Sequence, residues 1–342
     1  MSETAGSTSK TKTVAIVGAT GAVGQALAGV LARRRFPAAE YRLLASARSA
    51  GKTVDWIGEP RMVAELSRAS FEGVDIAFFS AGGDVSRLYA EAAVSVGTIV
   101  IDNSSAFRMM PDVPLVIPEI NAEAARRHAG IIANPNCSTI IMAVPLWPLH
   151  CVNTIRRVIV STYQAVSGAG ARAMEELDGQ TADVLAGRTA KPEVLSHQCA
   201  FNVFSHDTAI DDEGLNVEES KMIAETRKIF GTDRILIAPT CMRVPVRRAH
   251  LESLSVEFSD PIGAGDVREI LLSAPGVRVV DDRAANHFPM PVEAEGLDEI
   301  LVGRIRRDAT VPENRGIQLI CCGDQLLKGA ALNAVQIAEL LV

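Results

Sequence analysis

The sequence predicts an α/β protein that begins with a doubly wound parallel sheet (Rossmann-type) and continues with an α+β domain containing a large mixed sheet. Three observations support this prediction. Short apolar runs alternate with helical patterns in the N-terminal third, a glycine-rich turn joins the first run to a helix, and longer Val- and Ile-rich runs follow residue 150. Continuous apolar strands separated by helices are typical of a parallel sheet covered on both faces.

The expected elements follow from the spacing of apolar residues. In the first domain, strands are expected at 13–17, 41–45, 74–80, 98–101 and 130–133, with helices that include 22–34 and 85–96. In the second, strands are expected at 155–166, 250–258, 299–307 and 316–322, with helices at 170–185 and 217–230. Apolar residues at helical spacing over 326–341 predict a closing helix that packs back on the first domain.

The 342 residues correspond to about two domains at roughly 150 residues each. The change of pattern places one domain at 13–136, completed by the C-terminal helix at 325–342, and the other at 137–324. Residues 1–12, MSETAGSTSKTK, are small and polar and lack the apolar segment of a secretory signal. They are therefore expected to form a disordered tail, and the protein is expected to be cytoplasmic.

Composition excludes several functional classes. With 34 Lys and Arg against 41 Asp and Glu, the net charge of −7 is expected to repel nucleic acid and anionic lipid. The most apolar stretch, 131–149, is interrupted by Asn134, Asn136 and three prolines, which excludes a membrane span. The six cysteines form no CxxC pair and the histidines form no HExxH motif, so reduced thiols and no metal site are expected.

A glycine-rich turn predicts a dinucleotide site. The segment TVAIVGATGAVG places Gly18, Gly21 and Gly24 directly after a strand and at the start of a helix. Glycines at such a turn let backbone N–H groups approach a pyrophosphate at the positive end of the helix. The spacing is GxxGxxG rather than GxGxxG, and a purely structural strand-to-helix turn is the alternative interpretation.

The end of the second strand indicates which dinucleotide is bound. NAD-specific folds place an acidic residue about 20 residues after the glycines, where it binds the ribose 2′-hydroxyl. Here the segment LLASARSAGK carries Ser46, Arg48 and Ser49 and no acid. An arginine beside hydroxyl groups suits a 2′-phosphate, which favours NADP over an ordinary basic loop.

Cys137 is the candidate nucleophile. In GIIANPNCSTIIMAVPLWPL a strand ends, the chain turns at Asn134–Asn136, and Cys137 stands at the expected start of a helix. A helix N-terminus stabilises an anion, so the pKa of this thiol is expected to be depressed. A thiolate beside a nicotinamide cofactor indicates chemistry on an activated acyl group or an aldehyde through a thioester.

Charged residues elsewhere are candidates for acid/base work and for binding an anionic substrate. Arg243 and His250 occur together in PTCMRVPVRRAH, at the expected entry to a strand. Glu218 and Lys221 stand three apart on an expected helix and therefore share one face. Arg108 follows a strand end, where the binding loops of such sheets gather. A solvated surface position is the alternative for each of them taken singly.

Together these segments resemble the bacterial aspartate-semialdehyde dehydrogenase family nearly from end to end. The resemblance rests on VAIVGATGAVG, LLASARSAGK, IDNSSAFRMMPDVPLVIPEIN, ANPNCSTI, YQAVSGAGARAMEEL, EESKMIAETRKI, APTCMRVPVRRAH and GDQLLKGAALNAVQIAE. Several such motifs in order over about 300 residues are far more specific than any one of them.

The resemblance implies the NADP-dependent reductive dephosphorylation of L-4-aspartyl phosphate to L-aspartate 4-semialdehyde and phosphate. This step leads to lysine by way of diaminopimelate, and to threonine, methionine and isoleucine. It implies that Cys137 attacks the acyl phosphate and that hydride from NADPH reduces the resulting thioester. His250 is implied as the general acid/base, with a useful pKa near neutral pH. Gln164 matches the glutamine that orients the acyl group.

The same resemblance implies a set of binding residues. Arg243 matches a clamp for the substrate α-carboxylate, for which a planar bidentate donor is suited. Glu218 matches the partner of the substrate ammonium. Lys221, Arg108 and Asn136 are expected to bind phosphate.

Further residues match positions that contact the cofactor in this family. They are Gly18, Thr20, Gly21, Ala22, Val23, Gly24, Ser46, Arg48, Ser49, Ser167, Gly168 and Gln325. The backbone N–H of Asn136 or Cys137 is a candidate donor to the oxyanion. The resemblance also implies a homodimer formed through the sheet of the second domain.

One segment departs from the family pattern. Arg247 and Arg248 occupy a position between the Arg-x-Pro strand and the histidine that is usually small or polar. Strand alternation is expected to point at least one of them away from the pocket. The other is a candidate for tightening phosphate binding or altering His250.

Three other functions are considered. N-acetyl-γ-glutamyl-phosphate reductase uses the same fold and the same thioester logic, but NPNCST and the EESK helix favour a substrate with a free amino group. A catalytically silent NADP-binding paralogue would be expected to lose the nucleophile or the histidine. Epimerase or short-chain reductase chemistry would leave Cys137 without a role, and no Tyr-x-x-x-Lys pair occurs.

Overall fold

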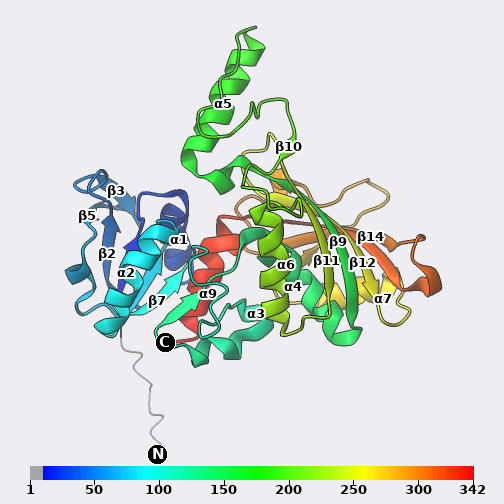
Figure 1. The fold of residues 1–342 in the computed structure, drawn as a ribbon, viewed down its shortest axis with the longest axis horizontal. Coiled ribbons are helices and arrows are strands. Elements are labelled where there is room, and N and C mark those ends of the chain that lie inside the picture. The colour runs from blue at the N-terminus through cyan, green and yellow to red at the C-terminus, as the bar shows by residue number, and fades with distance from the viewer. Residues whose placement is uncertain (1–10) are drawn as a thin grey trace, which may run out of the picture. The chain divides into compact units, whose positions relative to one another are not determined.

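The computed structural model describes residues 11–342, which form two compact units (Figure 1). The first unit contains the chain up to Pro114 together with Ala122–Asn134 and Ala334–Val342. The second contains Leu115–Asn121 and Pro135–Asn333. Residues 1–10, which make up most of the predicted N-terminal tail, lie outside the described part.

The first unit is built on a parallel sheet, as predicted. Within residues 11–342 this sheet has six strands in the order β5-β2-β1-β6-β7-β8, and every neighbouring pair is parallel. The strands are β1 (Lys12–Val17), β2 (Ala38–Ala45), β5 (Ala64–Glu65), β6 (Ile76–Phe79), β7 (Ile99–Asp102) and β8 (Ile131–Ala133). Because the chain continues to opposite sides of β1, the end of this strand is a topological switch point, where ligands bind in such sheets.

Helices and short elements complete the first unit. The helices α1 (Ala22–Arg33) and α2 (Gly83–Ser95) follow β1 and β6, and the 3-10 helices η1 (Arg68–Phe71) and η2 (Ala122–Arg127) are short. The hairpin of β3 (Thr53–Trp56) and β4 (Glu59–Met62) was not predicted, because its strands are short and mostly exposed. At the C-terminal end, Glu339 accepts two hydrogen bonds of 2.6 Å from the Arg34 guanidinium beyond α1.

The second unit is built on a mixed sheet, again as predicted. In the described chain it has seven strands in the order β10-β11-β9-β12-β15-β14-β13. They are β9 (Ile155–Gln164), β10 (Phe204–Ser205), β11 (Leu236–Arg243), β12 (His250–Phe258), β13 (Val277–Val279), β14 (Ile300–Arg307) and β15 (Gly316–Gly323). β11 pairs with β9 in parallel, whereas β9, β12, β15 and β14 pair antiparallel. The prediction omitted β11, whose Pro239 weakens the strand pattern.

One face of this sheet carries the main core, and the other is covered in part, where Ala294 of α8 (Pro291–Ala294) packs with Leu301 and Cys322. α4 (Cys137–Val152) is apolar on all sides and packs on β9, β12, β14 and β15, next to α6 (Val217–Phe230) and α7 (Ala264–Leu272). Residues of β12 alternate strictly between buried and half-buried, so every second side chain points toward α4. This alternation places His250 and Glu252 on the covered face and leaves Leu251 on the other.

The second unit contains further helical elements. They are α3 (Pro118–Asn121), η3 (Val166–Ala169), α5 (Ala171–Leu185), α8 (Pro291–Ala294), η4 (Pro312–Asn314), the π-helical η5 (Leu327–Ala331) and α9 (Leu332–Glu339), which continues into the first unit. α5 and the loop after it stand away from the sheet (Figure 1). Within residues 11–342 no helix is both long enough and apolar enough to cross a membrane.

Candidate active site

Three of the predicted site residues come together because they end or begin neighbouring strands. Arg243 is the last residue of β11 and pairs in register with Gln164, the last residue of β9. His250 is the first residue of β12, and its Nδ1 accepts a hydrogen bond of 3.0 Å from the backbone N–H of Ala165. The prediction that Arg243 lies at the entry to a strand is therefore wrong, since it lies at an exit.

The candidate nucleophile starts the central helix, as predicted. Asn136 is the N-cap of α4, and its Oδ1 accepts hydrogen bonds from the backbone N–H groups of Ser138 (2.9 Å) and Thr139 (3.1 Å). This side chain satisfies two donors that a helix end leaves unpaired, so Cys137 is the first helical residue. Cys137 is half-buried, whereas the other cysteines except Cys151 are buried.

Glu218 connects the nucleophile segment to the strand ends. Its Oε1 accepts hydrogen bonds from Asn136 Nδ2 (2.7 Å) and Gln164 Nε2 (3.2 Å), and its Oε2 lies 3.3 Å from Lys221 Nζ. Burial alone would raise the pKa of this carboxyl, but Lys221, His206 and the two amide donors outweigh burial and lower the pKa to about 2. The site therefore holds a buried carboxylate, and Glu218 and Lys221 share one helix face as predicted.

Gln164 is held by contacts on both sides of its amide. Its Nε2 also donates to Ser138 Oγ (2.9 Å), and its Oε1 accepts from Thr162 Oγ1 (3.3 Å). Ser138 directly follows Cys137, so the amide is fixed beside the start of α4. This position fits the predicted role of orienting an acyl group.

One predicted oxyanion donor is engaged elsewhere. The backbone N–H of Asn136 donates a hydrogen bond of 2.6 Å to Glu225 Oε2, on the third turn of α6. A donor aimed at a buried carboxylate cannot also serve a developing oxyanion, so the candidate role of the Asn136 N–H is wrong. The Cys137 N–H stays a prediction. The Asn136 side chain, predicted to bind phosphate, caps α4 and contacts Glu218.

The protonation state of His250 differs from the prediction. Because its Nδ1 accepts a backbone N–H, the hydrogen of the neutral ring is on Nε2. Among the described residues this buried Nε2 has no hydrogen-bond partner. Complete burial and the nearby Arg243 charge lower the pKa of His250 to about 3, well below the neutral value predicted from sequence. The imidazole is therefore a neutral donor at Nε2.

Three predicted cofactor positions surround this histidine. Gln325 accepts a hydrogen bond of 2.8 Å from the backbone N–H of Ala249, and its amide nitrogen donates to Ser167 Oγ. Ala249 has a φ of +70°, a conformation that side-chain-bearing residues rarely adopt. At Gly168, a Cβ atom would lie 3.5 Å from both Arg243 and His250. Gln325 and Ser167 thus hold the residue before His250, and Gly168 lies close to the His250 ring.

Arg247 and Arg248 lie in a loop rather than on a strand, so the alternation predicted for them does not apply. Arg247 forms an ion pair with Asp178 on α5. The Nε of Arg248 lies 2.8 Å from the buried Asp324, which precedes Gln325. Asp324 also accepts hydrogen bonds from the backbone N–H groups of Gly296 and Leu326. Both charges are therefore balanced by carboxylates, and the proposed effect on phosphate has no structural support.

In the first unit, the glycine-rich turn has a shape that only glycine permits at two positions. Gly18 has a φ of +91°, and a Cβ there would lie 2.8 Å from the Ser80 carbonyl oxygen. A Cβ on Gly24 would lie 2.3 Å from the Gly18 oxygen. Gly21 is the N-cap of α1, with Thr20 before it and Ala22 and Val23 after it. Such close backbone approach is what pyrophosphate binding requires.

The predicted 2′-phosphate residues lie beside this turn. The backbone N–H groups of Gly18 and Ala19 donate to the Leu44 carbonyl at 2.8 and 3.2 Å, which attaches the turn to the end of β2. Ser46 and Arg48 follow β2 and are exposed, and Ser49 is half-buried.

Arg108 is buried in the first unit. It donates to the carbonyl oxygens of Asn134 (2.9 Å) and Asn103 (2.8 Å). Its predicted role in phosphate binding stays a prediction.

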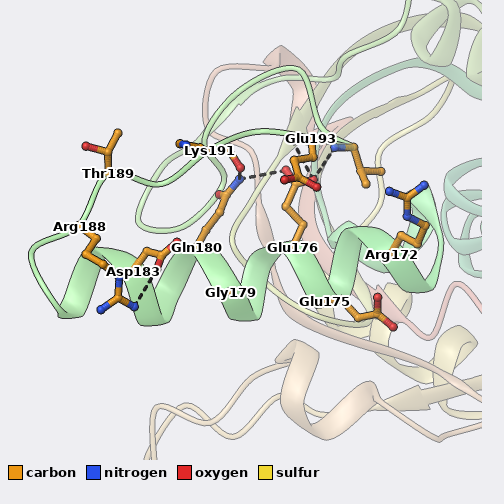
Figure 2. Close-up of a pocket in the computed structure, with 11 residues that line it drawn as sticks. Arg172, Glu175, Glu176, Gly179, Gln180, Asp183, Arg188, Thr189, Lys191 and Glu193 are labelled. Carbon is orange, nitrogen blue, oxygen red and sulfur yellow. Dashed lines mark hydrogen bonds and ion pairs between the residues drawn. The ribbon is translucent and has the colours of Figure 1, made fainter.

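A groove elsewhere in the second unit contains none of the predicted residues. It lies between α5 and the segment 188–194 (Figure 2). Arg188 pairs with Asp183, and Glu176 accepts hydrogen bonds from Gln180 and from the backbone of Val194. These contacts tie the loop to α5. Within residues 11–342 no group of three His, Cys, Asp or Glu side chains is placed to hold a metal ion.

Comparison with known proteins decides the family. A model described as "Semialdehyde dehydrogenase, NAD binding domain" matches residues 13–128, and one described as "Semialdehyde dehydrogenase, dimerisation domain" matches residues 146–328. The aspartate-semialdehyde dehydrogenase of Synechocystis sp. is 52% identical over 329 residues, which cover 96% of this chain and 97% of that protein. This chain belongs to the aspartate-semialdehyde dehydrogenase family.

Other family members agree with this assignment. The aspartate-semialdehyde dehydrogenase of Bacillus subtilis is 46% identical over 96% of both chains. The crystal structure of aspartate semialdehyde dehydrogenase II from Vibrio cholerae complexed with ASA superimposes with a TM-score of 0.94 at 45% identity, covering 97% of this chain and 98% of that one. The predictions of family, fold class and dehydrogenase activity are confirmed, and the first-domain match supports a nicotinamide cofactor.

One residue beside the candidate nucleophile was not predicted from the sequence. Gly329 lies in the π-helical turn η5, and a Cβ added there would be 2.9 Å from the Cβ and 3.3 Å from the Cα of Cys137. A glycine inside a helical pattern and a π-helical turn are both signals of a functional constraint. Only the first of them is visible in the sequence, in LLKGAAL.

Replacing Gly329 with Ala is expected to displace Cys137 and to lower kcat by at least about tenfold, since sub-ångström misplacement of a nucleophile is costly. The atoms that the added Cβ would meet include the Cα of Cys137, and a backbone atom in a close-packed interior cannot move aside easily. The checks are kcat and the rate of Cys137 alkylation. Gly179→Ala on α5, where the added Cβ meets nothing within 4 Å, is the matched control and should keep wild-type kinetics. Equal kinetics of the two variants would refute this contact as a constraint on catalysis.

Proposed function

We propose that this enzyme catalyses the NADP-dependent conversion of L-4-aspartyl phosphate to L-aspartate 4-semialdehyde and phosphate, through a thioester on Cys137. The observation that carries the proposal is the buried cluster at the start of α4. There, Asn136 and Ser138 on either side of Cys137 contact Glu218 and Gln164. Arg243, the last residue of β11, and His250, the first residue of β12, lie at the same end of the sheet.

The steps follow from the groups present. The Cys137 thiolate forms a bond to the acyl carbon, and the bond from that carbon to the phosphate oxygen breaks. NADPH, when held at the glycine turn, would supply the hydride that reduces the acyl group. The carbon–sulfur bond then breaks, which releases the aldehyde and restores the thiolate. The Nε2–H of His250 is the donor available to the oxygen that becomes negative in these steps.

The charged residues of the site are assigned to the charged groups of the substrate. Arg243 is proposed to bind the α-carboxylate and Glu218 the α-ammonium, because one is a buried cation and the other a buried carboxylate. Lys221, with Arg108 and Asn136, is proposed to bind the phosphate. A substrate with both a free amino group and a carboxylate satisfies the cluster better than an N-acetylated one, whose amide carries no charge.

The proposal is tested with the purified enzyme in the phosphate-dependent direction. L-aspartate 4-semialdehyde with phosphate and NADP is expected to give NADPH, and N-acetyl-L-glutamate 5-semialdehyde is expected to give none. Preference for the second aldehyde would refute the Glu218 assignment. No turnover with either aldehyde, while NADPH still binds, would favour the silent paralogue.

NADP is the proposed cofactor because the glycine turn has no acidic partner at the end of β2, where Ser46, Arg48 and Ser49 stand instead. The glycine cradle that a Cβ would fill supports dinucleotide binding at Gly18 and Gly24. The remaining proposed contacts are Thr20, Gly21, Ala22, Val23, Ser167, Gly168 and Gln325.

Replacing Arg48 with Ala is expected to weaken NADPH binding by about tenfold or more and to leave NADH binding nearly unchanged. The physical reason is that only NADPH carries a 2′-phosphate for the guanidinium. Dissociation constants of both cofactors, measured by fluorescence titration, check this. The nearby Arg61→Ala, on the exposed strand β4, is the control for a general loss of positive charge. Equal losses for both cofactors in Arg48→Ala would refute the 2′-phosphate assignment.

We propose a homodimer that forms through the face of the seven-stranded sheet opposite α4. On that face Ile159 and Tyr163 of β9 are 43% and 41% exposed, whereas Leu301 and Cys322 are covered by α8. The family model for residues 146–328 is described as a dimerisation domain, which supports this assignment. Light scattering should give twice the 36.4 kDa chain mass.

A further inference from the structure

The guanidinium of Arg243 has neighbours that the proposed mechanism does not use. One of its terminal nitrogens donates to the Ala165 carbonyl oxygen at 2.9 Å. The other lies 3.0 Å from His206 Nε2 and 3.3 Å from Asp207 Oδ1. Its Nε is buried and has no hydrogen-bond partner among residues 11–342. These contacts therefore fix the plane of the guanidinium and leave its Nε–H available to donate to a ligand.

These contacts determine which nitrogen of His206 carries a hydrogen. An arginine has donors only, so His206 Nε2 must accept from it. The ring hydrogen is then on Nδ1, which faces Thr208 Oγ1 at 3.4 Å. Burial and the Arg243 charge lower the pKa of His206, which keeps this ring neutral and able to accept. The other charges that act on it are Asp207, Glu218 and Lys221.

The segment that follows His206 also contacts Glu218, the second charged residue of the proposed substrate site. Thr208 Oγ1 accepts a hydrogen bond from the backbone N–H of Glu218 at 3.4 Å. The backbone N–H of His206 donates to the Cys241 carbonyl oxygen at 2.8 Å, which holds the segment against β11. Residues 206–208 therefore connect the end of β11, where Arg243 lies, to the first turn of α6, where Glu218 lies.

We infer that His206, oriented by Thr208, is a positioning residue that holds Arg243 for the α-carboxylate of the substrate. The segment 206–208 thereby sets the spacing between the cation and the anion that receive the amino-acid end. This inference rests on the proposed function, in which Arg243 binds the carboxylate and Glu218 the ammonium. His206 touches the guanidinium and is assigned no contact with the reacting carbonyl.

Steady-state kinetics of two variants separate positioning from a merely structural role. His206→Leu removes the acceptor, whereas His206→Gln keeps an oxygen near the place of Nε2. We expect the Leu variant to raise KM for L-aspartate 4-semialdehyde about tenfold, with kcat and KM for phosphate within about twofold of wild type. The Gln variant should recover most of the loss. His197→Leu makes the same replacement at an exposed histidine that packs on Phe204 and should leave all constants unchanged.

The outcomes also separate this inference from the proposed function. Arg243→Gln is measured in parallel and should raise the same KM by more than His206→Leu does. If Arg243→Gln raises that KM and His206→Leu leaves it unchanged, the positioning role is refuted while the proposed function stands. Equal losses in the Leu and Gln variants would also refute it, because the acceptor would then be irrelevant. A wild-type enzyme without turnover on this aldehyde would refute the proposed function itself.

Discussion

Replacing Cys137 with Ala is expected to lower turnover by at least about 1,000-fold and to leave NADPH binding nearly intact. The variant loses the sulfur that is proposed to carry the acyl group, and no other thiol is placed at the start of α4 in the described structure. The change is small and lies at a half-buried position, so the fold should be retained. Phosphate-dependent NADP reduction and a cofactor titration measure the two properties.

The same helix provides a matched control. Cys151 lies in the last turn of α4, where the helix end disfavours an anion, and burial raises the pKa of its thiol. Cys151→Ala should keep wild-type turnover, and iodoacetamide should alkylate Cys137 before Cys151 near pH 7. Residual turnover above about one per cent in Cys137→Ala would contradict the thioester mechanism.

Replacing His250 with Ala is expected to lower kcat about 100- to 10,000-fold, without preventing formation of the acyl-enzyme. The pH dependence expected from the structure differs from the one expected from the sequence. Because the pKa of His250 in the folded protein is about 3, the ring is neutral from pH 5 to pH 8. Titration of this ring should therefore produce no inflection of kcat/KM in that range. A wild-type inflection between pH 5 and 8 that disappears in His250→Ala would contradict this assignment.

The lowered pKa also affects stability. In the unfolded chain a histidine gains a proton near pH 6.5, whereas folded His250 stays neutral until about pH 3. Between these values the unfolded state binds more protons, so the free energy of unfolding should fall as the pH decreases from about 6.5 to about 3. His250→Ala should flatten this dependence, and denaturant unfolding at several pH values measures it. His197→Ala, at an exposed position, should leave it unchanged.

Local features of this protein were predictable because neighbouring residues produce them. The apolar periods predicted β12 and α6 with the bounds that the structure shows, and Asn136 before Cys137 predicted the start of α4. The glycine turn after β1 and the shared face of Glu218 and Lys221 also depend only on short-range geometry.

Long-range contacts were not predictable from these patterns. β11 was missed because Pro239 interrupts a short strand whose partner, β9, lies far away in the sequence. The contact of Glu225 with the Asn136 N–H joins residues 89 positions apart. Gly329 approaches Cys137 from still farther along the chain, so the constraint on it was hidden.

The sequence by itself determined which chemical groups the candidate site contains, and that Cys137 starts a helix and His250 a strand. Only the tertiary structure decided their partners and protonation states. His250 is a donor with a low pKa because it is buried beside Arg243, and the Asn136 N–H is engaged because α6 packs on α4. Desolvation and contacts across strands arise only when distant segments fold together, so no local pattern encodes them.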